Sequence, residues 1–421
     1  MLQEKKEVNI PAGKYVIDDL PIRITSNSRL SFSKDAIIKV NKNKKNESSV
    51  FIIDGESDIE FEGGAFYSYD DTVEVIKVVN NAHGISIKNV SCNGCRLFVS
   101  DVMKSYNLIN DMDLNDKITI SNCEGGSEKI KTRRAFIELH YTKNSECEGC
   151  VVDGYYHGMM FWGGDSNPNK DGAESNKRKV YNIRFSNNNI KNVQLGGIWG
   201  SMGKSVSIDS NNISHGRDVG VDFEGCTDSQ ATNNIIKDFR HGNLATFFLC
   251  KNILFENNTS ISTRKENIVA AIFNSTLNQA NRNLKFINNT FIGDGVNSYF
   301  EQNGTVNDLI IKNNSFSNVS IKLMSPNNGR LEISDNTFFF KIFPDVGTFV
   351  VSVSNVMNHE NNINLENNNV NSLSNWFLDK PVFNVKVLKP RNLNGSPIIR
   401  GNLVEKKSSQ YSTIISVTEQ K

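Results

Sequence analysis

The chain has 421 residues, and its 47 Lys and Arg nearly balance its 46 Asp and Glu, which leaves a formal net charge of +1. This balance argues against a nucleic-acid partner and a charged membrane surface, and no apolar stretch is long enough to span a bilayer. Residues 1–6 lack the apolar segment of a secretory signal. Seven cysteines is an odd number, which argues against a full disulfide framework and favours synthesis in a reducing cytoplasm.

Short apolar runs separated by polar turns open the chain. They occupy residues 8–23 and 26–40, and Pro11-Ala12-Gly13 interrupts the first of them. Such runs predict short strands. A weak form of a repeated six-residue signature then begins at Ile85, Ile118 and Cys147.

Two Cys-x-x-Cys pairs lie in this first part of the chain, Cys92 with Cys95 and Cys147 with Cys150. Four thiolates can bind zinc, but the pairs are much farther apart than in a zinc ribbon. Several of these cysteines also fall on core positions of the repeat, where a thiol behaves as a small apolar group. We therefore expect buried cysteines, no metal site and no cofactor.

From Phe185 onward the signature is strong. It consists of an apolar residue, two mainly polar residues, an invariant Asn, one further residue and usually a second apolar residue. Successive copies are 22 to 32 residues apart, and they begin at Phe185, Ile208, Ala231, Phe255, Phe286, Ile311, Ile333 and Leu365. This spacing suits one coil of a solenoid, in which each coil stacks on its neighbours. The sequence predicts an all-β fold, a right-handed parallel β-helix.

The invariant Asn stands at residues 188, 211, 234, 258, 289, 314, 336 and 368. Asn tolerates left-handed backbone, and its amide can satisfy backbone groups at a turn. We expect these amides to face inward at one corner and to form a hydrogen-bonded ladder from coil to coil. After Val370 the pattern fades. The predicted organisation is a β-helix with a carbohydrate-binding face over 1–345, and terminal coils with a cap or trimerisation region over 346–421.

A second strand in each coil begins about a dozen residues after the signature. Side chains alternate between the two faces of a strand, so Met160, Trp162 and Trp199 should point outward. The same alternation exposes Glu138 and His140 one coil earlier, and Asp165 ends the strand that carries Trp162. Indole rings stack on sugars, and carboxylates bind hydroxyl groups. This face is therefore predicted to bind a polysaccharide.

Asp222 and Glu224 form the strongest candidate catalytic pair. They alternate with apolar Val221 and Phe223 in Val219–Glu224, so both should face outward on a rigid strand. Repulsion between them would raise one pKa, which leaves one acid to donate a proton and one carboxylate to act as base or nucleophile. The alternative is that the two acids only solvate an exposed strand. Asp165 is a further catalytic candidate.

Four residues at strand edges are weaker candidates for substrate contacts. His157 and His241, like His215 between them, each precede Gly, and this repetition along the coils also suits a structural turn position. Asp218 beside the predicted acid strand suits turn capping equally well. Arg217 could bind an acidic sugar, although such residues are usually solvated.

Several segments resemble bacteriophage tailspike depolymerases of the pectate-lyase-like superfamily. The resemblance covers residues 8–320 and rests on Ile10-PAGKY, His157-GMMFWGGDSN, Gly196-GIWGSMG, Arg217-DVGVDFEGC and His241-GNLATFFLC. It implies a homotrimeric spike in the virion that cleaves capsular or O-antigen polysaccharide by glycoside hydrolysis. It assigns the catalytic role to Asp222 and Glu224, and more weakly to Asp165. Because no virion-attachment domain precedes the first strands, we expect either a trimmed chain or attachment through other phage tail proteins.

Two other functions suit the same fold. A polysaccharide lyase would need a basic residue and a partner that neutralises a uronate. A carbohydrate-binding adhesin would bind the bacterial surface polysaccharide without cleaving it. The sequence does not identify the sugar or the bond.

Overall fold

The computed structural model describes residues 6–41, 48–70, 72–126, 134–166, 177–264, 268–273, 280–293, 298–324, 327–341, 349–357, 363–372, 383–388, 398–405 and 415–420. Its backbone contacts divide the chain into two units, Met1–Gly216 and Arg217–Lys421. In both units the chain follows the same course. It passes through a strand of sheet A, a strand of sheet B and a strand of sheet C, and then returns to sheet A one coil further on.

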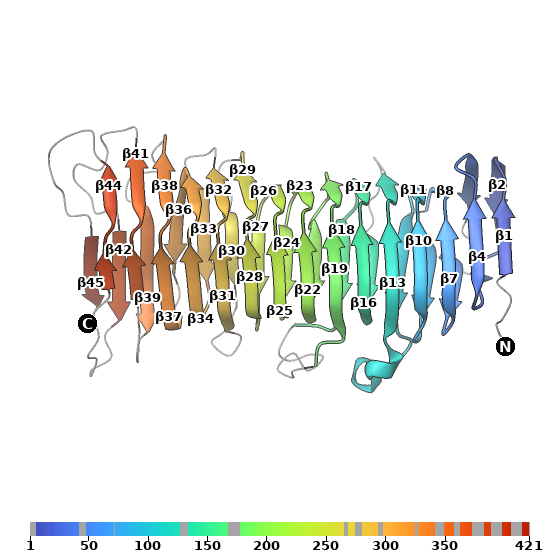
Figure 1. The fold of residues 1–421 in the computed structure, drawn as a ribbon, viewed down its shortest axis with the longest axis horizontal. Helices are drawn as coiled ribbons and strands as arrows, with labels where there is room; N and C mark the ends of the chain where they lie inside the picture. The colour runs from blue at the N-terminus through green and yellow to red at the C-terminus, as the bar shows by residue number, and fades with distance from the viewer. Residues whose placement is uncertain are drawn as a thin grey trace. The chain divides into compact units, whose positions relative to one another are not determined.

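The first unit contains these strands, and Figure 1 shows those of each sheet side by side in chain order. Sheet A is β1 (Lys6–Ile10), β4 (Ser28–Phe32), β7 (Ser57–Glu62), β10 (His83–Lys88), β13 (Asn115–Ser121), β16 (Thr142–Glu148), β19 (Val180–Ser186) and β22 (Gly203–Asp209). Sheet B is β2 (Gly13–Ile17), β5 (Ala36–Val40), β8 (Ala65–Tyr67), β11 (Ser91–Asn93), β14 (Glu124–Gly126), β17 (Val151–Asp153), β20 (Asn189–Lys191) and β23 (Asn212–Gly216). Sheet C is β3 (Ile22–Arg23), β6 (Ser49–Asp54), β9 (Glu74–Val79), β12 (Arg96–Asp101), β15 (Ala135–His140), β18 (His157–Trp162) and β21 (Ile198–Ser201).

The second unit repeats this arrangement. Sheet A is β25 (Thr227–Thr232), β28 (Lys251–Glu256), β31 (Asn281–Ile287), β34 (Val306–Lys312), β37 (Asn327–Ser334), β40 (Ile363–Glu366) and β43 (Ile398–Arg400). Sheet B is β26 (Ile235–Phe239), β29 (Thr259–Ser262), β32 (Thr290–Gly293), β35 (Ser315–Ser317), β38 (Thr337–Phe340), β41 (Asn369–Ser372) and β44 (Leu403–Glu405). Sheet C is β24 (Val219–Glu224), β27 (Gly242–Phe247), β30 (Ile268–Phe273), β33 (Ser298–Asn303), β36 (Val319–Leu323), β39 (Val351–Met357), β42 (Phe383–Leu388) and β45 (Ile415–Gln420).

Strand pairs within each unit are parallel and keep like residues in register, as in Phe255↔Phe286 and Phe291↔Phe316. Like residues therefore stack inside the coils. The rings of Phe291, Phe316 and Phe338 form one such column, with centroid separations of 4.9 and 4.7 Å. The predicted all-β parallel β-helix is confirmed.

The asparagine ladder occupies the turn from sheet A to sheet B, and its eight predicted members are at most 2% exposed. Asn289 shows the pattern. Its Oδ1 accepts from the backbone N–H and Nδ2 of Asn258, and its own Nδ2 donates to Asn314 Oδ1 and to the carbonyl of Phe255. The predicted inward ladder is confirmed. It extends one member beyond the predicted range, because Asn402 accepts from the backbone and side chain of Asn368.

One detail of the predicted turn is wrong. The left-handed residue is the one before the ladder Asn, as at Asn187, Asn257 and Asn288, which have φ of 57°, 56° and 56°. These residues are exposed, whereas the following Asn is buried. The left-handed backbone thus belongs to one residue and the ladder hydrogen bonds belong to the next, which explains why the signature so often contains Asn-Asn.

The cysteines lie in the core. All seven are free and buried, and Cys150 takes the ladder position, where its backbone N–H donates to Asn188 Oδ1. Burial raises the pKa of the Cys147 thiol well above its usual value. Among the described residues, no group of three or more His, Cys, Asp or Glu side chains is arranged to hold a metal ion.

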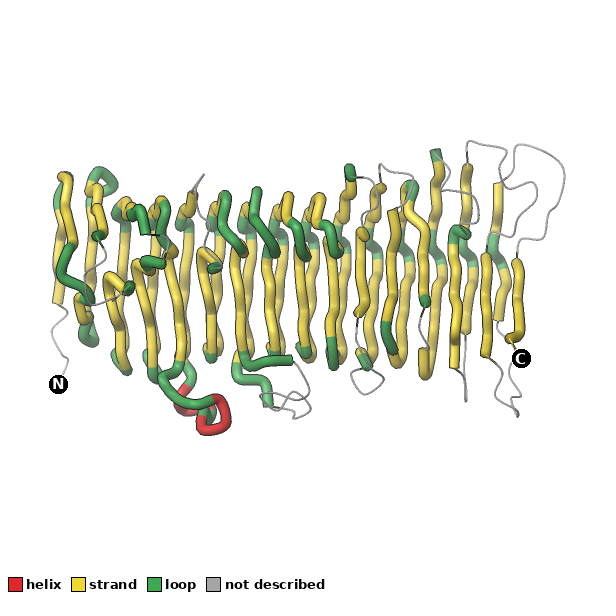
Figure 2. The backbone as a smooth tube through the Cα atoms, turned by 180° about the vertical axis from the view of Figure 1, so that it is seen from behind, coloured by secondary structure: helices red, strands yellow, loops and turns green. Residues whose placement is uncertain are grey.

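The longest described turn of the first unit leads from β12 to β13 and contains two short 3₁₀ helices, η1 (Tyr106–Leu108) and η2 (Asp111–Asp113). Figure 2 shows this turn projecting beyond the ends of the strands, with the helices in red. The capping box of Asn110 and Asp113 fixes η2. Within the described parts of the chain, no helix is long and apolar enough to cross a membrane.

Candidate functional site

Trp162 and Trp199 form a stacked pair on the outer face of sheet C in the first unit, here called the tryptophan platform. Their ring centroids are 5.5 Å apart, and the rings are inclined by only 21°. Both side chains are half-buried, whereas Phe161 and Ile198 beside them are fully buried. The predicted outward orientation of both indoles is confirmed. Their role in sugar binding stays a prediction.

Two histidines lie at the edges of the tryptophan platform. The His157 ring is 5.8 Å from Trp199, and its Nδ1 accepts from the backbone N–H of Gly196 at 3.2 Å. The His140 ring is 6.4 Å from Trp162. Burial lowers the pKa of His140, so its imidazole is neutral near pH 7.

Glu138 lies beside the tryptophan platform but is only 3% exposed. Its Oε1 is 3.1 Å from Arg96 Nη1, and Arg96 also pairs with Glu74. Burial is the largest single influence on the pKa of Glu138 and raises it, but the charges of Arg96, His140 and Arg134 and the backbone N–H of Ala135 together hold that pKa below its usual value. Its Oε2 is 3.6 Å from His140 Nε2. The Glu138 carboxylate thus lies beside the His140 ring and is buried. The prediction that Glu138 is exposed to solvent is wrong.

Sequence reasoning missed Glu74 and Arg96. Arg96 is 4% exposed in a strand of apolar neighbours, Arg96-Leu-Phe-Val-Ser100. A buried charge needs a partner of opposite charge, so an arginine within this apolar strand could have predicted a buried ion pair. Asp165 is half-buried and follows β18 after Gly163 and Gly164.

Asp222 and Glu224 lie in β24 of the second unit, where Val221 and Phe223 are fully buried between them. Glu224 is half-buried at the end of the strand, but the predicted exposure of Asp222 is not observed. Asp222 is only 1% exposed, and within the described part of the chain its Oδ1 has no hydrogen-bond partner. Burial raises the pKa of Asp222 well above its usual value, and the nearby charges of Glu224 and Asp218 raise it further. Burial and the neighbouring carboxylates therefore both favour the protonated form of Asp222.

The next coils of the second unit place apolar side chains beside these acids. In register, Asp222 is followed by Ala245, and Glu224 is followed by Phe247 and then Phe273. The Phe247 and Phe273 rings are 5.3 Å apart, inclined by 34° and half-buried. They form an aromatic strip in line with Glu224 that sequence reasoning missed, although Ala245-Thr-Phe-Phe248 carries the signal.

Asp218 and His241 form a pair at the opposite end of β24 from Glu224. His241 Nδ1 is 3.1 Å from Asp218 Oδ1, and the backbone N–H of His241 donates to the Asp218 carbonyl. His241 is exposed and Asp218 is half-buried. Both are thus held at the turn, as the structural alternative predicted, while the imidazole remains accessible. Arg217 is exposed.

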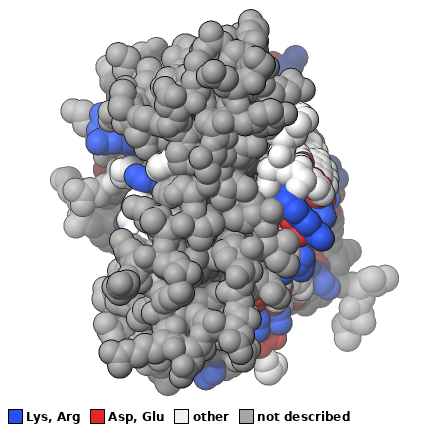
Figure 3. Space-filling view, turned by 90° about the vertical axis from the view of Figure 1, so that its left-hand side faces the viewer, with Lys and Arg blue, Asp and Glu red and all other residues white. Residues whose placement is uncertain are grey.

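Charged side chains of both signs lie close together on the flank visible in Figure 3. This agrees with the balanced composition and shows no single-sign field over that flank.

No family model and no curated protein matches the chain. Among solved structures, pre-mature bacteriophage phi29 gene product 12 has a TM-score of 0.59 at 12% identity, and the match covers 90% of this chain and 59% of that one. The exopolygalacturonase of Thermotoga maritima has a TM-score of 0.44 at 11% identity and covers 80% and 84%. The Streptococcus pneumoniae adhesin PfbA has a TM-score of 0.45 at 13% identity and covers 87% and 91%.

These similarities concern the fold. The chain spans only 59% of the length of the phi29 protein. The fold is the right-handed parallel β-helix, and a fold alone does not assign a function.

Proposed function

We propose that this protein is a tailspike-type depolymerase that hydrolyses glycosidic bonds of a bacterial surface polysaccharide, with Asp222 and Glu224 as its acid pair. The observation that carries the proposal is the buried carboxyl of Asp222, which stands beside a second carboxylate on a rigid strand. Glycoside hydrolysis needs one protonated and one ionised carboxyl group. The different environments of the two acids supply this division.

In the proposed reaction, Asp222 donates its proton to the leaving glycosidic oxygen. Glu224, which is the more exposed of the two, acts as the ionised partner that activates water or attacks the sugar. Phe247 and Phe273 would support the apolar face of a sugar ring next to Glu224. Because Asp222 is only 1% exposed, the sugar must displace a covering side chain to reach it, so binding precedes proton transfer.

The wider assignment rests on the resemblance of the segments around His157, Trp199 and Asp222 to tailspike depolymerases. A bacteriophage protein among the similar folds agrees with it. A homotrimer, a place in the virion and attachment through other tail proteins follow from the same resemblance. Asp165 remains a secondary catalytic candidate in this proposal, and Arg217 and His241 remain candidate substrate contacts.

The test uses Asp222→Asn and Glu224→Gln against a panel of capsular and O-antigen polysaccharides, with release of reducing ends as the readout. Each change should lower turnover by about 10²–10⁴. Glu301→Gln is the matched control, because Glu301 lies further along the register row of Asp222, Ala245 and Ala271. That variant should keep near-native turnover.

Three outcomes would reject the proposal. Near-native turnover in both acid variants would move the active site elsewhere. Unsaturated products would identify a lyase. Tight binding of a polysaccharide that the wild-type protein never cleaves would identify an adhesin.

A further inference from the structure

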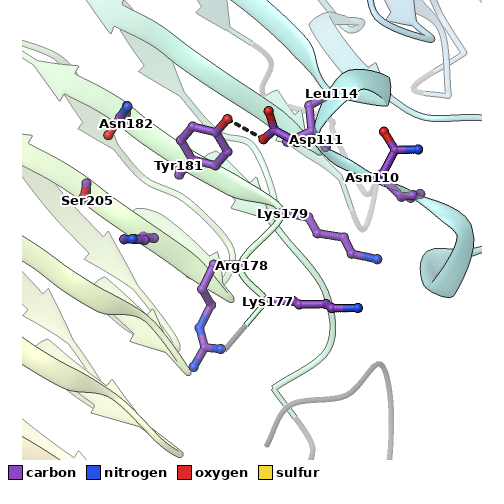
Figure 4. A pocket seen from close by; sticks show the side chains of 11 residues that line it. Asn110, Asp111, Leu114, Lys177, Arg178, Lys179, Tyr181, Asn182 and Ser205 are labelled. Atoms are coloured by element: carbon purple, nitrogen blue, oxygen red, sulfur yellow. Dashed lines mark hydrogen bonds between the residues drawn. The ribbon is translucent and has the colours of Figure 1, made fainter. Parts of the chain in front are cut away.

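A pocket of about 670 Å³ opens in the first unit, where the chain turns from sheet C to sheet A. Three segments line it: 109–114 in the turn after β12, 177–182 at the start of β19, and 204–205 in β22. Figure 4 shows the side chains of Lys177 and Lys179 extending in the same direction, toward the side on which the turn with Asn110 lies. This basic pocket contains none of the residues assigned above.

Positive charge dominates the basic pocket. Lys177, Arg178, Lys179 and Lys204 line it, and Asp111 is the acid among its described lining residues. The charge of Asp111 is already compensated, as described next. Four of the described lining side chains are therefore cationic, and the one acid among them is paired with Lys143.

Asp111 is bound from two sides. Its Oδ2 is 3.0 Å from Lys143 Nζ, and its Oδ1 accepts from the Tyr181 hydroxyl at 2.5 Å, the bond drawn in Figure 4. The hydrogen bonds from Tyr181 and Lys143 lower the pKa of Asp111. Asp111 thus holds Lys143 and Tyr181 in place.

Register places a lysine on each side of Tyr181. Lys143 in β16, Tyr181 in β19 and Lys204 in β22 are paired across successive coils, which are about 4.8 Å apart. Lys204 is exposed, and Tyr181 is half-buried. A phenol ring flanked by ammonium groups suits a sugar ring that carries a carboxylate.

A row of rings joins the basic pocket to the tryptophan platform. Trp162 contacts His140, His140 contacts Tyr141, and Tyr141 contacts Tyr106, each with a centroid separation of 6.4 Å. The Lys179 ammonium group then lies 3.5 Å from the centroid of the Tyr106 ring and also contacts the Tyr106 carbonyl. An extended saccharide on the platform would reach the pocket along this row.

We propose that the basic pocket binds a carboxylate-bearing sugar unit, so that the ligand is an acidic polysaccharide. This inference rests on the proposed function only for the statement that the ligand is a polysaccharide. Lys204 is the proposed contact for the carboxylate, Tyr181 is the platform for the ring, and Lys179 is a positioning residue.

The experiment measures binding by isothermal titration calorimetry with the full chain carrying Asp222→Asn, so that cleavage does not interfere. The probes are a hexasaccharide of galacturonate, a hyaluronan hexasaccharide, neutral maltohexaose and inorganic phosphate. Each is titrated into this protein, into a version with Lys204→Ala and into a version with Lys251→Ala. Lys251 is an exposed lysine of sheet A in the second unit, so both lysine variants change the net charge equally.

At least one acidic hexasaccharide should bind more tightly than maltohexaose and phosphate. Lys204→Ala should raise its Kd about fivefold to tenfold, and Lys251→Ala should leave it unchanged. The difference should shrink in about 1 M salt, where the Debye length is about 3 Å. Equal binding of neutral and acidic sugars, equal effects of the two lysine changes, or phosphate binding as tight as that of the sugar would each overturn the inference. Loss of turnover in the acid variants is a separate result, so the failure of one proposal leaves the other standing.

Discussion

Removing one amide of the asparagine ladder tests the source of the coil-to-coil stability. Asn289→Ala deletes four hydrogen bonds, two accepted from Asn258 and two donated to Phe255 and Asn314. The backbone N–H of Asn258 then has no acceptor in a site that is 1% exposed. A buried donor without an acceptor costs about 1–3 kcal/mol. The other three lost bonds add about 1 kcal/mol, because Asn258 Nδ2 still donates to Ala231 and Asn314 Oδ1 still accepts from the backbone of residue 289.

The expected loss is therefore about 2–4 kcal/mol, measured as a lower midpoint of urea unfolding followed by far-UV circular dichroism. Asn288→Gly is the matched control. Asn288 is exposed and has a φ of 56°, which glycine adopts without strain, so this variant should change stability by no more than about 0.5 kcal/mol. Asn289→Asp keeps the shape but loses both donors, and it should destabilise at least as much as Ala. Equal midpoints for the Ala and Gly variants would show that the ladder does not stabilise the fold.

Two further predictions concern the outer face of sheet C. Trp199→Ala should weaken oligosaccharide binding, measured by calorimetry, by about 1–2 kcal/mol. Its melting temperature should barely change, because the buried side chain of Ile198 still packs in the core. A large loss of stability with unchanged binding would contradict this prediction. The pKa of Asp222 is raised in the folded state, so its contribution to wild-type stability is complete below the unfolded-state pKa of about 3.9 and is lost as the pH rises toward the folded-state pKa. Asp222→Asn should therefore become more stable than the wild type as the pH rises. Melting temperatures of both proteins should thus agree near pH 4 and diverge by pH 7, and a gap independent of pH would show that Asp222 is not the group responsible.

The repeat made the coil predictable because two constraints coincide at each signature. The third residue must accept a left-handed backbone, as Asn257 does. The side chain of the fourth must satisfy buried backbone groups, as Asn258 does for the N–H of Asn234 and the carbonyl of Ala231. The copy of the signature that contains Asn402 was not predicted. In that copy Gly401 takes the left-handed position and Arg400 precedes it, so its sequence differs from the other copies. The predicted division at residue 345 remains a prediction, and the backbone contacts divide the chain at Gly216 instead.

The orientation of the candidate site was predictable, but its contacts were not. Alternation about Phe161 correctly turned Trp162 outward, but the same alternation about Phe223 did not show that Asp222 is buried. It could not show that Arg96 reaches Glu138, because these residues are 42 positions apart and turns of unequal length intervene. The basic pocket was equally hidden, since it is built from the turns between sheets C and A, which vary from coil to coil.

The fold and the chemistry use different positions of each coil, and this separation explains why fold similarity leaves the function open. The β-helix needs inward residues such as Val221 and Phe223 and a ladder residue at the turn from sheet A to sheet B. None of these constraints acts on an outward position of sheet C. A chain can therefore keep this fold, with a TM-score of 0.59 to another protein at 12% identity, while residues on the outer face of sheet C change freely. A buried acid beside a second acid brings a desolvation cost that the coil does not require. For that reason Asp222, more than any feature of the repeat, is the residue on which the proposed hydrolysis should be judged.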